Sequence, residues 1–423
     1  MLDLVNNLWV LIAALLVFTM TISVGLLEVG ELGLDFANSL YKTVLMTGAA
    51  IVVMAVVGFN TAFAPTWGGV IGNPTYGPGF FLGGFSTDPN AVWWSMGPNY
   101  FGTGLSGSTY FLFETAFAAV TYALVGVVFL KKVKAVAYSL FAIPYFALIW
   151  ALPAAWIWNP TGWLAKLGMV DFAGGLVVHG AAGAAGLGIL VQVWREERAK
   201  GHRVSPAAPI QVNPGWLTLA ILLLWVGWFG FNPGSVLAFN GEAMVVVITT
   251  FLAAAAAGFS FLICQAIGLR KGPTLIDAVN GILMGLIVIT PLAGFVSPGS
   301  ALILGLFGGP VFYLAETYIA TVRWFSDPVG LVPGHLVGGL FGVTMIGFFA
   351  QTAYAAPAGA PGLPNGILFG GGMSALHQIG LEWLGILAVL AVVFVLSFVI
   401  AWILAELLGG ITGTRPHVDE PSA

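Results

Sequence analysis

Eleven long apolar stretches recur along the chain, and each has about the length that a membrane-spanning helix needs. They cover residues 7–29, 41–64, 108–130, 135–156, 172–194, 215–237, 243–268, 274–296, 299–322, 334–351 and 379–409. A helix must offer ~20 mostly apolar residues to cross the hydrocarbon core of a bilayer, which is ~30 Å thick. The pattern therefore predicts an all-α integral membrane protein with eleven transmembrane helices.

The composition points to the same class of protein. Hydrophobic residues make up 59% of the chain and charged residues only 7%, whereas a soluble domain carries about 25% charged residues. The chain also holds 58 glycines, and many of them fall inside the apolar stretches. Because small residues let membrane helices approach closely, we expect a compact helical bundle whose surroundings are the lipid bilayer. No nucleic-acid partner is expected.

The basic residues between the spans predict an orientation, because short cytoplasmic loops are enriched in Lys and Arg. If the N-terminus lies outside, the outer side holds only Lys166. The inner side then holds twelve basic residues: Lys42, Lys131, Lys132, Lys134, Arg195, Arg198, Lys200, Arg203, Arg270, Lys271, Arg323 and Arg415. We therefore expect a multi-pass protein of the cell membrane with its N-terminus outside and its C-terminus inside.

Two segments share the pattern Asp-x2-Gly-x4-His-x3-Gly-x2-Gly. The first runs from Asp171 through His179, and the second runs from Asp327 through His335. The spans that contain them start from opposite faces, which is typical of inverted repeats in transporters. We expect a membrane domain over 1–410, made of a first half (1–194), a second half (214–351) and a final helix (379–409), with a cytoplasmic tail over 411–423.

The pattern also predicts where the two histidines lie. Each aspartate precedes an apolar helix and is a plausible helix cap, and Pro328 favours a first helical position. Each histidine follows its aspartate by eight residues, or about 12 Å at 1.5 Å per residue. The two side chains would thus approach the middle of the bilayer from opposite faces. The glycines four and seven residues later share the histidine's helix face, so each histidine should point into the bundle.

Ionisable residues inside a membrane are rare and are functional candidates by default. The alternative is a buried pair of histidines that backbone or hydroxyl groups satisfy. A metal site needs three or four ligands, and no further His, Cys or carboxylate shares the pattern. An intramembrane enzyme would need a nucleophile or a metal at a suitable spacing, and none is found. We therefore expect no metal, no cofactor and no enzymatic activity.

Four segments resemble the ammonium transporter family (Amt/Mep/Rhesus), and together they span nearly the whole chain. They are Asp171–His179, Gly227–Ser235, the Asp327-Pro stretch that ends at His335, and the segment from Asn280-Gly281 to Thr290-Pro291. The resemblance implies eleven spans with the N-terminus outside, in agreement with the spans and charges above. It further implies assembly as a homotrimer.

The resemblance implies a role for each matching residue of the pore. His179 and His335 match twin histidines that line it, and Trp228 matches a tryptophan deeper in its wall. Phe117 matches the outer member of a phenylalanine gate, and Phe231 matches the inner member.

An ammonium recruitment site is implied outside that gate. Ser235 matches its hydroxyl, Trp158 its tryptophan, with Trp156 as the alternative, and Asp171 the aspartate that organises the site. Aromatic faces attract a cation by contacts worth roughly 0.5–2 kcal/mol each. Beyond the gate a bare cation would be costly in a dry pore, so ammonium is expected to shed a proton and continue as ammonia past the two imidazoles.

The chain departs from the family pattern in a few places. Glu114 stands where the family usually has a glutamine, and it either strengthens cation recruitment or completes a local hydrogen-bond network. Ser326 and Gly330 replace acidic residues on the inner side, while Glu28 and Glu31 add charge there. The short tail weakens the expectation of regulation by the trimeric signalling protein PII. The alternative function is an ammonium sensor of the same fold, coupled to a cytoplasmic or fused signalling domain.

Overall fold

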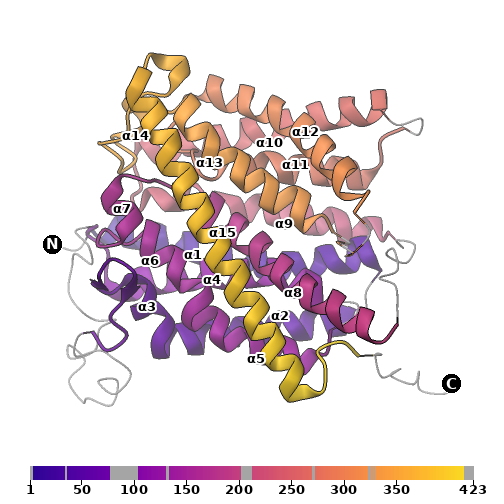
Figure 1. The fold of residues 1–423 in the computed structure, drawn as a ribbon. Coiled ribbons are helices and arrows are strands. Elements are labelled where there is room, and N and C mark those ends of the chain that lie inside the picture. Colours follow the sequence, from indigo (N-terminus) through magenta and orange to yellow (C-terminus); the bar gives the residue numbers. More distant parts are fainter. Residues whose placement is uncertain are drawn as a thin grey trace.

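The computed structural model describes residues 3–33, 36–76, 103–129, 133–201, 212–268, 272–322, 324, 327 and 329–413, without the side chains of Leu32 and Asn38. In these residues the protein is a bundle of helices that run roughly side by side (Figure 1). One small sheet of two antiparallel strands, β1 (Thr66–Trp67) and β2 (Ile71–Gly72), lies at one end of the bundle.

Helices of the first half alternate between long α-helices and short irregular turns. In chain order they are α1 (Leu4–Leu32), α2 (Phe36–Val53), η1 (Met54–Gly58), α3 (Phe59–Phe63), α4 (Gly107–Gly126), η6 (Val127–Phe129), α5 (Ala135–Pro144), η7 (Tyr145–Ile149), α6 (Ala151–Ile157), α7 (Trp163–Leu167), η8 (Gly175–Gly180) and α8 (Ala181–Ala199).

The second half and the final helix likewise combine long α-helices with short helical segments. They comprise α9 (Pro214–Phe231), η9 (Pro233–Val236), α10 (Gly241–Gly268), α11 (Leu275–Ile289), α12 (Pro298–Ile319), η10 (Leu331–Leu336), α13 (Val337–Phe349), α14 (Thr352–Ala355), η11 (Ile367–Phe369) and α15 (Gly372–Leu408). The last helix begins seven residues before the expected start of the final span at 379.

Ten helical segments of the described chain are long and apolar enough to cross a membrane. They correspond to ten of the eleven expected spans. The eighth expected span, 274–296, contains the shorter helix α11 of 15 residues, or about 22 Å. That helix stops before Pro291, which has no backbone N–H to continue the helical hydrogen bonds. The all-helical membrane class is confirmed, while the count of eleven crossings remains a prediction.

Helix starts are fixed by side chains that satisfy free backbone N–H groups. At each of four helices the residue before the first helical residue accepts a hydrogen bond from the N–H three positions later: Asp3, Ser106, Asn213 and Ser297. At α11, Thr274 and Asp277 form a reciprocal capping box. Such caps stabilise a helix by ~1 kcal/mol each, and they set where the spans begin.

Glycines let pairs of long helices pack at short range. A side chain at Gly230 of α9 would collide with the carbonyl oxygen of Ala13 on α1. Gly305 of α12 lies equally close to Ala253 of α10, and Gly188 of α8 lies against the backbone of α15. The expected compact bundle follows from these contacts, because backbones approach closely only where Cβ atoms are absent.

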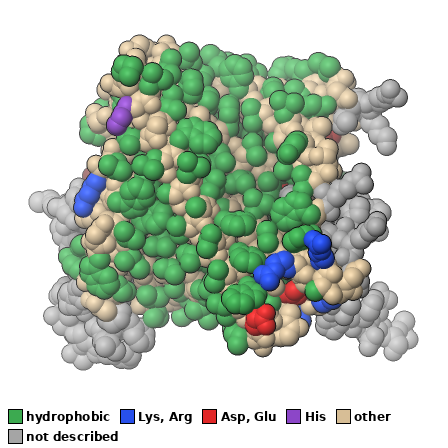
Figure 2. Space-filling model, viewed as in Figure 1, with side chains coloured by type: hydrophobic (Ala, Val, Ile, Leu, Met, Phe, Trp, Pro, Cys, Tyr) green, Lys and Arg blue, Asp and Glu red, His purple; other side chains and the backbone are tan. Residues whose placement is uncertain are grey.

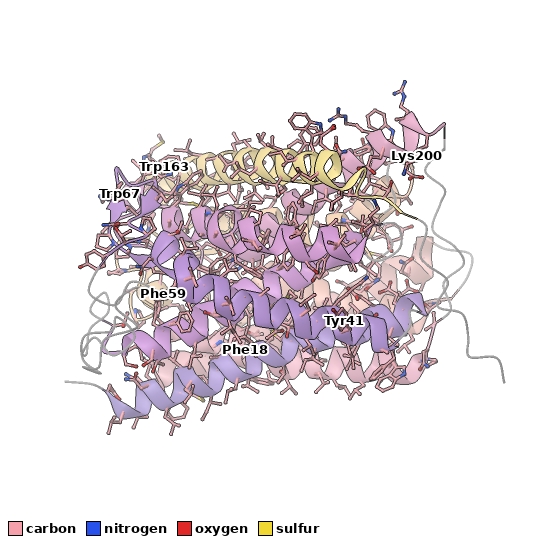
Figure 3. The ribbon with its side chains drawn as sticks, turned by 90° about the horizontal axis from the view of Figure 1, so that it is seen from below. Phe18, Tyr41, Phe59, Trp67, Trp163 and Lys200 are labelled. Atoms are coloured by element: carbon pink, nitrogen blue, oxygen red, sulfur yellow. The ribbon has the colours of Figure 1, made fainter. Side chains whose placement is uncertain are left out.

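The two ends of the bundle differ in chemistry. Trp67 and Trp163 lie at one end, hereafter the tryptophan end, and Lys200 lies at the other, hereafter the lysine end (Figure 3). Between them the visible face is covered by hydrophobic side chains, and most Lys and Arg side chains gather at the lower right (Figure 2). An apolar belt between polar ends suits a protein that spans a bilayer. Which end faces the cytoplasm remains a prediction.

Candidate functional site

Asp171 organises the start of the helix that carries His179. Its two carboxylate oxygens accept four backbone N–H groups at 2.8–3.0 Å, from Gly174, Gly175, Leu176 and Val177. Burial raises the pKa of this carboxyl group, and the four amide donors oppose that rise by stabilising the charged form. The predicted role as a helix cap is confirmed.

Asp327 repeats this arrangement in a reduced form. It accepts the N–H groups of Leu331 and Val332 at 2.9 and 2.7 Å. Burial raises the pKa of Asp327 as well, against the opposing effect of backbone amides. The residue between cap and helix, Gly330, has a φ of 70°, a left-handed conformation that suits glycine. Gly174 holds the equivalent place with a φ of 114°.

Because of these turns, the two histidines lie fewer helical residues from the helix start than the sequence predicted. The helices begin at Gly175 and Leu331, so each histidine is the fifth helical residue and not the eighth. The expectation of about 12 Å assumed helix from the aspartate onward, whereas the chain between cap and helix is not helical. Helix η10 begins at Leu331 and not at Pro328, the expected first helical position. Pro328 itself lies outside the described part of the chain. Both first turns are π-helical, a conformation that is frequent at functional sites.

The two histidines meet. Their Nδ1 atoms are 3.1 Å apart, and their ring centroids are 5.2 Å apart. Such a contact needs one nitrogen that donates and one that accepts, so the two rings share a proton and cannot both be imidazolium. His179 is 1% exposed, and its Nε2 has no partner among the described residues. His335 is only partly buried.

Glycines bring the two histidine helices together. A side chain at Gly339, four residues after His335, would collide with the carbonyl oxygen of Gly175. A side chain at Gly183, four residues after His179, would lie 2.5 Å from the Cβ of Leu336. Each helix thus approaches the π-helical segment of the other through the glycine that shares its histidine's face. The expectation that both histidines point into the bundle is confirmed.

An apolar cavity surrounds the pair. Its lining consists of Met20, Val24, Leu27, Val120, Leu124, Val178, His179, Leu224, Trp228, Phe231, Leu283 and His335. The cavity offers room for about one molecule the size of water. Apart from the imidazoles and the tryptophan ring, its walls offer hydrocarbon and aromatic surface, so an ion inside would lose most of its hydration.

Phe231, which lines this cavity, packs against a second phenylalanine, Phe117. The rings of Phe117 on α4 and Phe231 on α9 have centroids 4.3 Å apart, and both residues are at most 1% exposed. Phe231 also lies nearly parallel to His179, with an interplanar angle of 13°. The aromatic pair therefore separates the histidines from whatever lies on the other side of Phe117.

Trp228 forms a further wall next to His179, with ring centroids 5.8 Å apart and an interplanar angle of 23°. Its Nε1 donates to the hydroxyl of Thr290 at 3.1 Å. Asn232 approaches the same hydroxyl at 3.2 Å. Thr290 and Asn232 thus orient the tryptophan. The sequence motifs contain both residues but do not indicate this role.

Trp158 lies on the far side of the phenylalanine pair. Its ring meets that of Phe117 edge-on at 5.7 Å, and its Nε1 donates to the backbone carbonyl of Asp171 at 2.7 Å. Trp156, the alternative, instead donates to the carbonyl of Val70 and contacts Trp163. Of the two tryptophans, Trp158 is therefore the one that lies next to Phe117.

Ser235 follows Phe231 by one helical turn. Its hydroxyl donates to the carbonyl of Phe231 at 2.8 Å, which leaves the oxygen lone pairs able to accept. The residue is partly exposed. It sits in η9, at the same end of α9 as Phe231.

Glu114 lies one turn before Phe117 on α4. It is 5% exposed, its Oε2 has no partner among the described residues, and Tyr110 hydrogen-bonds to the carboxyl group. The carboxyl group of Glu114 is thus bonded by Tyr110 and still has one buried oxygen, Oε2, that can accept a further hydrogen bond.

A clamp on the Asp171 segment was not expected from the sequence. Gln378 of α15 donates to the carbonyl of Gly168 at 3.0 Å, and Glu382 accepts the N–H of Val170 at 3.2 Å. Both side chains are fully or nearly buried. The final helix therefore holds the turn that precedes Asp171, and only the tertiary contact reveals it.

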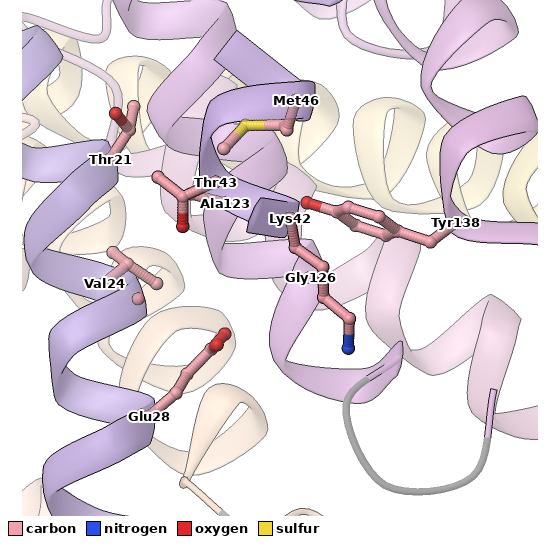
Figure 4. Close-up of a pocket in the computed structure, with 10 residues that line it drawn as sticks. Thr21, Val24, Glu28, Lys42, Thr43, Met46, Ala123, Gly126 and Tyr138 are labelled. Atoms are coloured by element: carbon pink, nitrogen blue, oxygen red, sulfur yellow. The ribbon is translucent and has the colours of Figure 1, made fainter. Parts of the chain in front are cut away.

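A second, polar pocket lies beside the histidine cavity (Figure 4). Glu28 extends into it from α1 and Lys42 from α2, and Tyr138 closes another side. Val24 of α1 lines both this pocket and the histidine cavity. One layer of side chains on α1 and α4 thus separates the two spaces.

Known proteins resemble the chain over its whole length. The model of the Ammonium Transporter Family matches residues 8–414. An ammonium transporter of Bacillus subtilis is 31% identical over 99% of this chain and 95% of its own length. An ammonium transporter of Aquifex aeolicus is 31% identical over 96% and 89%.

Solved structures agree in fold. Mep2 of Saccharomyces cerevisiae superimposes with a TM-score of 0.82 at 26% identity, over 100% of this chain and 90% of that one. A structure described as a sensor Amt protein gives 0.81 at 26% identity, over 99% and 98%. Together with the apolar helices, these matches identify a multi-pass protein of the cell membrane. The chain belongs to the Ammonium Transporter Family.

Proposed function

We propose that this protein moves ammonium across the membrane by binding the cation at an outer aromatic site and passing ammonia along the histidine pair. The observation that carries the proposal is the 3.1 Å contact between the Nδ1 atoms of His179 and His335 inside an apolar cavity. The residues on either side of the phenylalanine pair suit two different forms of the substrate.

Ammonium is recruited outside the phenylalanine pair. Trp158 and Phe117 offer aromatic surfaces to a cation, and Ser235 offers an acceptor lone pair. The bond from Trp158 to the carbonyl of Asp171 supports this role, because it holds the indole ring against Phe117. Asp171 contributes by fixing the backbone on which the site rests.

Glu114 strengthens this recruitment. One part of its carboxyl group is bonded by Tyr110, while Oε2 is buried and accepts no hydrogen bond among the described residues. This acceptor oxygen, one turn from Phe117, can accept an N–H group of the cation next to the phenylalanine pair. The two roles considered for Glu114 are thus compatible in one side chain.

Passage inward requires the loss of a proton. The rings of Phe117 and Phe231 are in contact, and the cavity beyond them is almost wholly apolar. Burying an ion there costs several kcal/mol even in a relaxed site. Ammonium avoids this cost by breaking one N–H bond: the electron pair stays on nitrogen, and the proton passes to the unpartnered Nε2 of His179, which can give up its Nδ1 proton to His335. Potassium has no such step. Selectivity then follows from deprotonation.

The imidazole pair serves the neutral molecule and the proton. With one Nδ1 donating and the other accepting, a proton shift between them reverses the two roles. The free Nε2 of His179 can bond ammonia in the cavity. Trp228 and Phe231 hold the His179 ring between them, which keeps the pair aligned.

Transport is preferred over sensing, the alternative considered from the sequence. The curated relatives that match over nearly the whole chain are named ammonium transporters. Likeness to the sensor Amt protein is no greater than likeness to Mep2, so the fold does not single out a sensor. We retain the N-outside orientation, the homotrimer and a PII-type or fused signalling partner as expectations.

An ammonium concentration jump on proteoliposomes tests the proposal. The wild-type protein should take up ammonium and exclude potassium, and the current recorded at the same time reports whether charge moves. Replacing both His179 and His335 with Ala should abolish selective ammonium conduction in a protein that still folds. Ammonium uptake that persists in the double variant, with potassium still excluded, would contradict the mechanism.

A further inference from the structure

Glu31 occupies an unusual place beyond the histidine cavity. It lies in the last turn of α1, is 3% exposed, and its Oε2 is buried without a partner among the described residues. Leu27, one turn earlier on the same helix face, lines the histidine cavity. Glu31 therefore lies about 6 Å further along α1 from that cavity, toward the lysine end.

Two more carboxylates lie near Glu31. Both Asp327 and Glu316 are close enough to interact electrostatically with it. Phe312 of α12 lies against Gly330, next to the Asp327 cap, and Glu316 follows Phe312 by one turn. Residues 316 and 327 are partly exposed. A cation can thus approach from solvent while Glu31 forms the buried wall.

Gln265 gives a second sign that the cluster is arranged for a ligand. Its Nε2 donates to Asp277 at 3.2 Å and to Glu316 at 3.3 Å. Its Oε1 is buried and has no partner among the described residues. The cluster therefore contains two unused buried acceptor oxygens, one on Glu31 and one on Gln265. Leaving a buried polar atom without a hydrogen bond costs ~1–3 kcal/mol. A ligand that donates hydrogen bonds to both oxygens would recover this cost.

The neighbouring carboxylate Glu28 provides a contrast. It faces the separate pocket that Lys42 enters from α2 (Figure 4), and the amine of Lys42 offsets its charge. Glu31, by contrast, interacts electrostatically with two acidic residues, Asp327 and Glu316. A site with several carboxylates and free acceptors suits a small cation with several donors.

We propose that Glu31, Glu316 and Asp327 form a second ammonium site at the lysine end of the pathway, beyond His335. The proposal rests on the transport function above, because it places the site where ammonium leaves or enters at that end. A carboxylate oxygen of Glu31 and the Oε1 of Gln265 accept N–H groups of the ion, and the other carboxylates balance its charge. The site mirrors the recruitment site at Trp158, with carboxylates in place of aromatic faces.

Side-specific kinetics test the site in proteoliposomes that hold the protein in one orientation. Glu31→Gln should raise the KM for ammonium that enters from the lysine end about tenfold or more, the effect of losing a hydrogen bond to a charged group. The KM for entry from the tryptophan end should not change. Glu28→Gln, one turn away in the other pocket, is the matched control and should leave both KM values unchanged.

A binding measurement separates this site from the transport proposal. In a protein whose recruitment site is disabled by Trp158→Ala and Ser235→Ala, calorimetric titration with ammonium chloride should still detect binding. Adding Glu31→Gln, or Glu316→Gln at the partly exposed position, should remove it. Residual binding that neither substitution weakens overturns the site, as does an unchanged lysine-end KM in Glu31→Gln. An absence of flux in the wild-type protein would count against the transport function alone, because the titration needs no flux.

Discussion

The two Asp-Gly-His units have the same local geometry and different surroundings. In both, an aspartate caps a π-helical turn after a left-handed glycine, and the histidine is the fifth helical residue. Asp171 binds four amides and is 4% exposed, whereas Asp327 binds two and is partly exposed.

The histidines differ in the same sense. His179 lies between the rings of Trp228 and Phe231. His335 is partly buried, and the aspartate that caps its helix, Asp327, interacts electrostatically with Glu31. One repeated motif thus supplies an enclosed unit on the aromatic side and a more exposed one on the acidic side. The difference arises from what packs around the motif, since the motif itself is nearly the same.

The largest expected effect concerns stability at the two caps. Asp171→Ala leaves four buried amides unpaired and should lower the free energy of unfolding by about 4 kcal/mol or more. Asp327→Ala frees two amides at a partly exposed site and should cost about 1–3 kcal/mol. Thermal melting in detergent compares the two. Equal losses would show that the caps are equivalent despite their different surroundings.

Single histidine substitutions sharpen the comparison. Both His179→Ala and His335→Ala should abolish selective ammonium flux, because each removes one partner of the Nδ1 contact. His179→Ala should also destabilise the fold by about 2 kcal/mol, since it leaves a cavity between two aromatic rings, whereas His335→Ala should cost less. Paired flux and melting measurements test both statements, and a variant that keeps selective flux would contradict the shared role.

Glu114 tests the aromatic side alone. Glu114→Gln keeps the shape of the side chain and replaces one of its two acceptor oxygens with an amide donor, so the KM for ammonium entering past Trp158 should rise several-fold. Stability should change little, because the amide can still accept from Tyr110. An unchanged KM would leave Glu114 with the hydrogen-bond network as its sole role.

The smallest expected effect separates the two tryptophans. Trp158→Phe keeps an aromatic face and loses the bond to the Asp171 carbonyl, and should raise the ammonium KM by about two- to fivefold, given ~1 kcal/mol for such a bond. Trp156→Phe loses a bond to Val70 away from the gate and should leave the KM unchanged. A larger kinetic effect at position 156 would reverse the assignment of the recruiting tryptophan.

Sequence reasoning brought the two histidines together because their signal is repeated along the chain. The shared spacing around His179 and His335 predicted that they meet, and their Nδ1 contact confirms it. The roles expected of Phe117, Phe231, Trp158 and Trp228 came only from resemblance to a family. The 31 phenylalanines and 15 tryptophans of the chain form no pattern that singles these four out. The expected first helical positions, 172 and 328, lie three residues before the observed starts at Gly175 and Leu331, because each aspartate is followed by a non-helical turn with a left-handed glycine.

Other features depend on residues far apart in the chain. Glu382 and Gln378 hold the turn before Asp171 from more than 200 residues away. The orientation of Trp228 depends on Thr290, 62 residues later. No periodicity or spacing relates such pairs, because their proximity arises only when helices from both halves pack together.

The sequence by itself determined the membrane class, most of the spans and the repeated Asp-Gly-His units. The reason is that lipid demands long apolar helices and each aspartate contacts amides only a few residues away. Only the tertiary structure decided that one unit is enclosed by aromatic rings and that the other neighbours Glu31 and Glu316. Those environments are built from α1, α9 and α12, whose relative positions depend on the packing of glycines and apolar side chains across the whole bundle.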